Sequence, residues 1–190
     1  MEEIKNKLLV NGKHLFSTKG FKRTGIKDIT QNTGIAAGTF YNYFDSKEEL
    51  FLEIYLEENN KLKQEILKVI DMNQDPVKVI SASIHLMIDR MENNPILREF
   101  FNRKQYKKII NKLNDNLVKK NYEFANNLFA PFLDKWKQEG KLKEIDNNMF
   151  IALMDTIFYI YSHKKDIGEK FFPELLDFFV ESIAKNLIKS

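Results

Sequence analysis

Small and hydrogen-bonding side chains gather in the stretch TGIAAGTFYNYFDSKEEL, residues 33–50. If residues 36–43 form a short helix, Phe40 and Phe44 lie one turn apart and face inward together. The opposite side then carries one glycine, one amide and two hydroxyls, and no long aliphatic side chain. Neutral groups of this size suit close approach to the base edges and phosphates of a nucleic acid. The residues of this outward face are Gly38, Thr39, Tyr41 and Asn42.

Two further helices have to position this face. An apolar stripe predicts a first helix over about residues 3–18, and Gly20 is its expected stop. Thr24 is expected to cap a short second helix that begins near Gly25. Gly34 ends that helix, because glycine tolerates the left-handed turn that reverses the chain. Two short helices around a glycine turn, preceded by a stabilising helix, are typical of a helix-turn-helix, whose second helix enters the major groove.

A fourth helix follows directly. Ser46 and Glu49 have capping-box spacing, and the apolar pattern predicts a helix from Ser46 to about residue 72. The start of a helix offers free backbone N–H groups and a positive dipole end, which attract phosphate. Lys47 lies beside this start.

The rest of the chain also predicts helices. The last two are apolar on more than one side, so they must be buried on several sides, inside the domain or against a partner. The predicted fold is all-α, with an N-terminal three-helix helix-turn-helix domain over residues 1–46 and a C-terminal helical bundle over 47–190. The later helices are expected from Pro76, capped by Asp75, to residues 93–97, over about 104–130, from Asp146 as a cap over 147–163 after a turn at Gly140, and over 169–188.

Composition narrows the class of protein. The 190 residues are 43% hydrophobic and 30% charged and contain no cysteine, which favours a folded soluble protein of a reducing cytoplasm. No apolar run is long enough to span a bilayer, so no membrane association is expected. The three histidines are isolated and have no metal-ligand spacing. No nucleophile, phosphate-loop or dinucleotide motif appears, so we expect neither an enzyme nor a cofactor.

Positive charge is concentrated near the N-terminus. The net charge is +3, yet residues 1–44 hold seven basic and only three acidic side chains. Such asymmetry is expected when one end of a chain meets a polyanion, although a solvated charged face is equally compatible with it.

The segment FSTKGFKRTGIKDITQNTGIAAGTFYNYFDSKEELF resembles the tetracycline-repressor (TetR) family of bacterial regulators. The resemblance implies a homodimer with an N-terminal DNA-binding domain and a C-terminal effector and dimerisation domain. It also implies two sets of DNA contacts in each subunit. Contacts to phosphates are implied for Thr24, Tyr41, Tyr43 and Lys47, and approach to bases for Lys27, Ala37, Gly38, Thr39 and Asn42. Ala37 stands where many members carry a longer polar residue, and it offers only a methyl group.

Two interpretations fit the aromatic and methionine residues of the C-terminal part. They are a plain core, or some of them line a cavity for a small apolar or amphipathic effector, since such side chains adapt to apolar ligands. The candidate ligand residues are His85, Met87, Asp89, Met91, Phe101, Tyr122, Phe129, Met154, Asp155 and Phe158.

The last two helices are expected to form the homodimer contact as a four-helix interface. The candidate interface residues are Phe150, Ile151, Met154, Phe158, Phe178, Phe179 and Ile183.

The sequence therefore predicts a cytoplasmic, nucleoid-associated bacterial repressor that leaves a pseudo-palindromic double-stranded operator when a small, mainly apolar ligand binds. Ligand binding would shift the fourth helix and change the spacing of the two recognition helices. An architectural or cell-division DNA-binding factor of the same fold, without a small-molecule effector, is the alternative.

Overall fold

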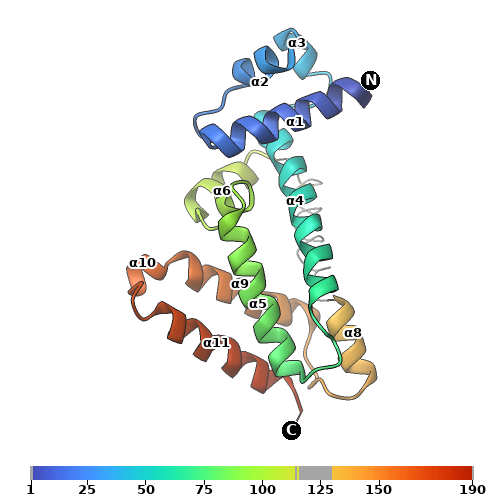
Figure 1. Ribbon diagram of the computed structural model, residues 1–190, viewed down its shortest axis with the longest axis vertical. Helices are drawn as coiled ribbons and strands as arrows, with labels where there is room; N and C mark the ends of the chain where they lie inside the picture. The colour runs from blue at the N-terminus through green and yellow to red at the C-terminus, as the bar shows by residue number, and fades with distance from the viewer. Residues whose placement is uncertain (1, 114, 116–129, 190) are drawn as a thin grey trace. The chain divides into compact units, whose positions relative to one another are not determined.

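The computed structural model describes residues 2–113, 115 and 130–189, and every regular element in this part of the chain is a helix (Figure 1). The all-α prediction is therefore confirmed. The helices are α1 Glu2–Lys19, α2 Ile26–Thr33, α3 Ala37–Phe40, α4 Lys47–Val69, α5 Pro76–Asn93, the 3-10 helix η1 Leu97–Phe100, α6 Arg103–Ile110, α8 Ala130–Gln138, α9 Asn147–Ser162, α10 Lys164–Ile167 and α11 Phe172–Leu187.

The chain divides into two compact units. The first unit takes residues 1–61 and 91–121, and the second takes 62–90 and 122–190. Both α4 and α5 contribute residues to each unit. The domain boundary after residue 46 stays a prediction.

The core of the first unit is built where α1, α2, α3 and α4 bury their apolar faces. Leu8, Ile29 and Phe40 are fully buried there. Gly12 lets α1 approach α4 closely, because a Cβ atom at this position would lie 2.9 Å from Leu50 Cδ2. Since burial of apolar area is the main favourable term in folding, this core holds the short α2 and α3 helices, which are too short to persist alone.

At three helix starts the side chain predicted to cap the helix accepts a backbone N–H group of its first turn. The Asp146 carboxylate accepts the backbone N–H of Asn148 at 2.8 Å, and the Asp75 carboxylate accepts that of Lys78 at 3.2 Å. The Ser46 hydroxyl accepts the N–H of Glu49 at 3.1 Å. These side chains satisfy N–H groups that have no partner inside the helix.

The prediction of Thr24 as the cap of α2 is wrong. Gly25 occupies the cap position, and its N–H donates to the Asp28 carboxylate at 2.7 Å. The Thr24 hydroxyl points the other way and donates to the carbonyls of Gly20, at 2.9 Å, and Leu15, at 3.3 Å. Tertiary contact with α1 therefore outweighs the local capping preference.

The predicted long helix over 104–130 is also wrong. α6 ends at Ile110, and a turn follows over residues 111–113. Short polar side chains such as that of Asn111 compete for backbone hydrogen bonds and favour turns over helix. Residues 116–129 lie outside the described part of the chain.

Several other boundaries differ more modestly from the expectation. α3 is a single turn followed by a hydrogen-bonded turn over 41–43, and α4 ends at Val69 rather than near residue 72. The short α10 fills the predicted gap between the last two long helices. Helix ends fray and their last hydrogen bonds are weak, so a sequence pattern predicts the end residue of a helix less well than the helix itself.

The core of the second unit is apolar and draws on α5, α8, α9 and α11. Trp136 and Phe150 are each 1% exposed. α9 and α11 pack against each other (Figure 1). An isolated antiparallel bridge joins Leu142 to Ile188 and fastens the end of α11 to the loop before α9. In the described residues no helix is long and apolar enough to cross a bilayer.

Candidate nucleic-acid interface

The turn between α2 and α3 sets the direction of the second helix. Gly34 has φ +75°, the left-handed region in which a side chain is strained. Its N–H donates to Gln31 O, and the N–H of Ile35 donates to Thr30 O at 3.0 Å. These bonds end α2 at Thr33 and reverse the chain, so that α3 starts three residues after Gly34, at Ala37.

α3 and the turn after it present the predicted face to solvent. Phe40 and Phe44 are buried, as expected from their spacing. Tyr41 is 57% exposed. The outward orientation inferred from the sequence is thus confirmed, whereas contact with DNA stays a prediction. Ala37, Gly38 and Asn42 are exposed as well, and Thr39 and Tyr43 are half-buried.

Gly38 is not required by the packing of the protein. An added Cβ atom there would meet no atom within 4 Å, and its φ is not positive. Glycine in a helix costs roughly 0.5–1 kcal/mol relative to alanine. The packing and the backbone conformation of the protein therefore give no reason for a glycine at this position.

Lys47 and Thr24 face the corner between α1 and α2. Lys47 Nζ donates to Phe21 O at 3.0 Å and to Thr24 O at 2.8 Å, and it lies 4.3 Å from the centroid of the Phe21 ring. Burial lowers the pKa of Lys47, and the charge of Lys112 adds to this, while Glu48 acts to raise it. Thr24 is only 1% exposed. Both side chains therefore hold the corner, and their predicted phosphate contacts stay untested.

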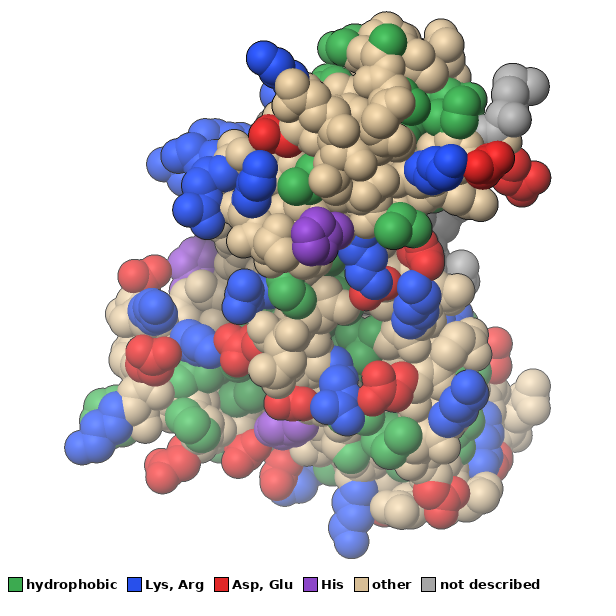
Figure 2. All heavy atoms as spheres, turned by 45° about the horizontal axis from the view of Figure 1, so that its top comes forward, with side chains coloured by type: hydrophobic (Ala, Val, Ile, Leu, Met, Phe, Trp, Pro, Cys, Tyr) green, Lys and Arg blue, Asp and Glu red, His purple; other side chains and the backbone are tan. Residues whose placement is uncertain are grey.

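The start of α2 carries the exposed basic residue of the site. The Lys27 ammonium has no hydrogen-bond or ion-pair partner among the described residues, whereas the neighbouring Asp28 carboxylate accepts the Gly25 N–H and lies 3.3 Å from Lys19 Nζ. These two contacts, the Gly25 N–H first, lower the pKa of Asp28. Asp28 thus stays ionised while Lys27 remains available to a polyanion. Figure 2 shows Lys and Arg side chains gathered at one edge of the part that carries α1 to α3.

The start of α4 is partly satisfied from within the chain. Besides the Ser46 cap, the Glu49 carboxylate accepts the N–H of Asp45 at 2.7 Å. Glu48 is nearly buried and accepts Lys112 Nζ at 2.7 Å. The expected phosphate seat at this helix start therefore has carboxylates beside it, which the capping pattern alone did not weigh.

The candidate ligand residues are divided between the two units. Met91 and Phe101 belong to the first unit, and the others that are described belong to the second. His85 Nε2 lies 2.7 Å from Asp177 Oδ1 and its Nδ1 lies 2.8 Å from Ser81 O, so the ring links α5 to α11. Within their units Met87, Met91, Met154 and Phe158 are buried, Phe101 is half-buried, Asp89 and Asp155 are exposed, and Tyr122 and Phe129 lie outside the described residues.

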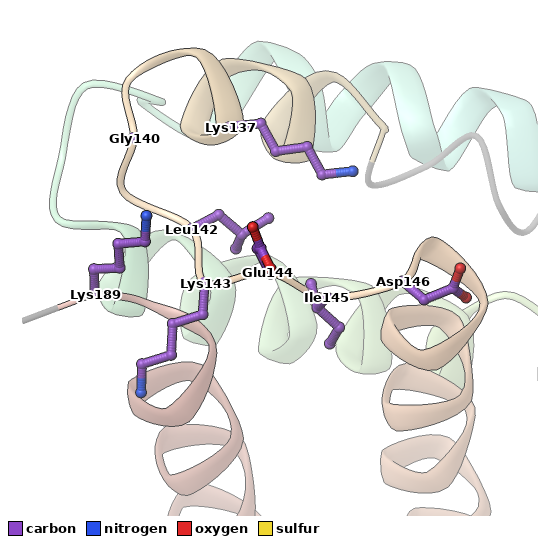
Figure 3. Close-up of a pocket in the computed structure, with 8 residues that line it drawn as sticks. All are labelled: Lys137, Gly140, Leu142, Lys143, Glu144, Ile145, Asp146 and Lys189. Atoms are coloured by element: carbon purple, nitrogen blue, oxygen red, sulfur yellow. The ribbon is translucent and has the colours of Figure 1, made fainter.

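A groove of about 490 Å³ lies elsewhere in the second unit (Figure 3). It is open to solvent, and its lining comes from the end of α8, the following loop and Lys189, two residues beyond the end of α11. None of the candidate ligand residues lines it. Sequence reasoning had no signal for this groove, because the Leu142–Ile188 bridge brings its parts together. The lining residues are Lys137, Gly140, Leu142, Lys143, Glu144, Ile145, Asp146 and Lys189.

The candidate dimer residues differ in exposure. Phe178 is 66% exposed. Tyr159 and Phe171, which the sequence reading did not single out for this role, are exposed as well. The side chain of Ile151 is not among those that the structure describes. Of the remaining candidates, Phe179 and Ile183 are half-buried, and Phe150, Met154 and Phe158 are buried within the protomer.

No group of three or more His, Asp or Glu side chains in the described ranges is arranged to hold a metal ion.

Known proteins share the arrangement of α1 to α4. Residues 8–54 match the model of the bacterial regulatory proteins of the tetR family. The N-terminal part of this chain is therefore a tetR-family domain. The chain is 26% identical over 97 residues to the HTH-type transcriptional regulator YxaF of Bacillus subtilis, covering 50% of this chain and 51% of YxaF. It is 24% identical to the HTH-type transcriptional repressor KstR2 of Mycolicibacterium smegmatis, covering 47% of this chain and 43% of KstR2.

A likeness to a solved structure extends over nearly the whole chain. The solved structure of RolR with resorcinol matches with a TM-score of 0.73 over 98% of this chain and 88% of RolR, at 17% identity. At that identity the likeness establishes the fold alone. The matched part spans about half the length of the curated relatives YxaF and KstR2.

Thr24→Val keeps the side-chain volume and removes the hydroxyl that donates to two carbonyls of the corner. We expect it to lower the free energy of unfolding by about 1 kcal/mol, the usual value of a buried hydrogen bond. Urea unfolding followed by circular dichroism measures this. Thr18→Val, whose hydroxyl also donates to a carbonyl but on an exposed residue, is the control and should change stability by less than about 0.5 kcal/mol. Equal losses in both variants would contradict the role given to Thr24.

Proposed function

We propose that this TetR-family regulator is a DNA-binding repressor that a small, mainly apolar ligand releases from its operator. The observation that carries the DNA-binding part is the outward face of α3, where Gly38 has open space in front of it. A backbone or base edge can approach a glycine more closely than any other residue. The name of KstR2 as a repressor supports the direction of regulation.

The proposed contacts fall into two groups. Exposed Lys27 and Asn42, with Ala37, Gly38 and Thr39, would approach bases, since amide and ammonium groups read the major-groove edges and methyl groups fit thymine. Tyr41 and Tyr43 would donate to phosphates, which fix register. For Thr24 and Lys47 we infer a positioning role through the corner between α1 and α2.

An apolar ligand with a hydrogen-bonding oxygen would suit the second unit. Its core contains two buried polar atoms with no hydrogen-bond partner in the described structure, Ser83 Oγ and Trp136 Nε1. Buried polar groups are nearly always bonded, so such atoms call for a partner. The apolar Met87, Met154 and Phe158 are buried in the same unit. RolR, a structural relative, was solved with resorcinol, a small ring with two hydroxyls.

Dimerisation is proposed through the outer faces of α9 and α11. Tyr159 and Phe178 lie on the sides of these helices opposite to their buried residues, and both are more than half exposed. Exposed aromatic side chains on paired helices are typical of a subunit interface. Two copies would then present two α3 helices to successive major grooves. α4 and α5, which contribute to both units, would carry the ligand signal between them.

The first test is selection of bound fragments from genomic DNA by the purified protein at two salt concentrations. Recovery of a discrete pseudo-palindrome that persists at the higher salt supports the proposal. Dispersed fragments that are lost with salt would indicate phosphate binding alone and contradict it.

Gly38→Ala should have opposite effects on folding stability and on DNA binding. We expect the variant to unfold at a higher urea concentration, with a gain of up to about 1 kcal/mol, because alanine favours helix. Operator affinity should fall at least tenfold, because the new methyl group occupies the approach space. Urea unfolding and fluorescence anisotropy with the selected operator measure the two effects. Asn60→Ala, an exposed change on α4, is the control. Unchanged affinity in Gly38→Ala would refute close approach at α3.

Phe178→Asp tests the dimer. A buried, unpaired carboxylate at an interface is costly, so the variant should sediment as a monomer at micromolar concentration, where the wild type is a dimer. Val10→Asp, at an equally exposed apolar position on α1, should leave the dimer intact. A monomeric wild type, or a dimeric Phe178→Asp, would rule out this interface.

Phenol and benzene test the ligand class. Phenol offers an oxygen to Trp136 Nε1–H and benzene does not, so calorimetry should show about tenfold tighter binding of phenol, the value of one hydrogen bond. Trp136→Phe should remove this difference. Equal affinities for the two probes in the wild type, or binding of neither, would contradict a site at these buried polar atoms.

A further inference from the structure

Glu58, on α4, is a buried acidic residue whose carboxylate accepts donors from three segments of the chain. Its side chain is 9% exposed. Oε1 lies 2.7 Å from Lys13 Nζ of α1 and 3.0 Å from Lys61 Nζ of its own helix. Oε2 accepts Asn94 Nδ2 at 3.0 Å, and Asn94 is the first residue after α5. One carboxylate therefore joins α1, α4 and the end of α5.

The Asn94 side chain is held in one orientation. Its Oδ1 accepts the N–H groups of Ile96 and Leu97 at 2.9 and 3.2 Å, at the start of η1. Since the amide oxygen is used by these two donors, the amide NH2 group faces the Glu58 carboxylate, which can only accept. The contact at Glu58 therefore reaches the start of η1 as well as the end of α5.

Lys13 belongs to the stretch of α1 that holds α2. Asn11 Oδ1, two residues earlier on α1, accepts Asn32 Nδ2 of α2 at 3.0 Å. α1 and α2 also pack against each other. Residues 11–13 lie within one helical turn, so a displacement of α1 at Lys13 is passed to α2, and through the Gly34 turn to α3.

Folding stability alone gives little reason for a buried carboxylate at this position. Apolar side chains of similar volume often replace a buried ion pair without loss of stability, because the ionised groups no longer have to leave water. A buried charge with directed donors instead favours one defined arrangement, as a polar group between helices can fix their register. At Glu58 the arrangement so defined is that of α1 relative to residues 94–97.

We propose that Glu58 is a positioning residue that connects the end of α5 to α1, so that a displacement of Asn94 moves α1 and changes how α2 and α3 meet DNA. The DNA part of this inference rests on the proposed function. The connection itself does not, because all of its members lie within the first unit and it can be measured without DNA.

Hydrogen exchange in the full chain without DNA tests the connection. Lys13→Met keeps the length of the side chain and removes its charge, so Glu58 orients Asn94 less firmly. The amides of Ile96 and Leu97, which Asn94 holds, should then exchange about threefold faster or more. Nuclear magnetic resonance resolves these two amides.

Lys5→Met is the matched control for Lys13→Met. The Lys5 ammonium also bonds a carboxylate of α4, that of Glu53, at 2.8 Å, but Glu53 does not bond to Asn94 in the described structure. Exchange at residues 96 and 97 should therefore stay at the wild-type rate in Lys5→Met. Unchanged exchange in Lys13→Met, or equal acceleration in both variants, would overturn the proposal.

A swap of donor and acceptor separates the connection from a general loss of packing. Glu58→Gln brings two N–H donors face to face, and Asn94→Asp brings two carboxylates together, so each alone should speed exchange at residues 96 and 97. In the double variant the new amide at position 58 can donate to the new carboxylate at position 94, while its oxygen still accepts Lys13 Nζ. Exchange should return to within about twofold of the wild type. Single effects that simply add in the double variant would contradict the connection.

Operator binding, measured by fluorescence anisotropy, gives the readout with DNA. Lys13→Met and Asn94→Ser, in which the serine hydroxyl can still cap η1, should each weaken binding about threefold or more. Their double variant should bind no more weakly than the weaker single variant, because both changes break the same connection, whereas Lys5→Met and Asn94→Ser should add. If no discrete operator exists but the exchange results hold, the connection stands and the proposed function fails. If the operator is bound and the effects of Lys13→Met and Asn94→Ser add, the positioning role fails.

Discussion

The placement of one ammonium group, that of Lys47, organises the first unit. Its three donors find two backbone carbonyls and the face of an aromatic ring at the corner between α1 and α2. Carbonyls at the ends of short segments have no helical partner, and a half-buried cation donates to them instead. Since α2 and α3 are too short to be stable alone, their orientation depends on this corner and on the core beneath it.

The two faces of the helix-turn-helix therefore have different chemistry. The inner side joins the Lys47 ammonium to the backbone oxygens of Phe21 and Thr24. Elsewhere in the first unit Glu58 of α4 is buried, yet its pKa is lowered by its three donors Lys13, Asn94 and Lys61. The outer face of α3 has neutral, small side chains with few contacts to the rest of the chain. Charged interactions therefore hold the geometry of the inner side, while the outer face offers short-range groups, which discriminate between partners better than they attract them.

Local rules explain which predictions from the sequence succeeded. The Ser46, Asp75 and Asp146 caps and the inward placement of Phe40 and Phe44 depend on residues within a few positions of each other, so the pattern contained them. The hydroxyl of Thr24 donates to the carbonyls of Gly20 and Leu15 on its N-terminal side, whereas the capping rule considered only the helix that follows. The end of α6 at Ile110 falls inside a span whose apolar pattern continues, so the pattern did not mark it. The last two helices are apolar on several sides, so periodicity alone could not tell which of Phe150 and Phe178 the protomer buries.

Gly12 has a consequence for how this sequence can vary. A Cβ atom there would meet the side chains of Leu50 and Ile54, both fully enclosed in the core. A mutation to alanine is therefore accommodated only if one of those neighbours moves or becomes smaller. Position 12 and positions 50 and 54 should accordingly change together during evolution, and a lineage that acquires a larger residue at 12 first must pass through a less stable intermediate.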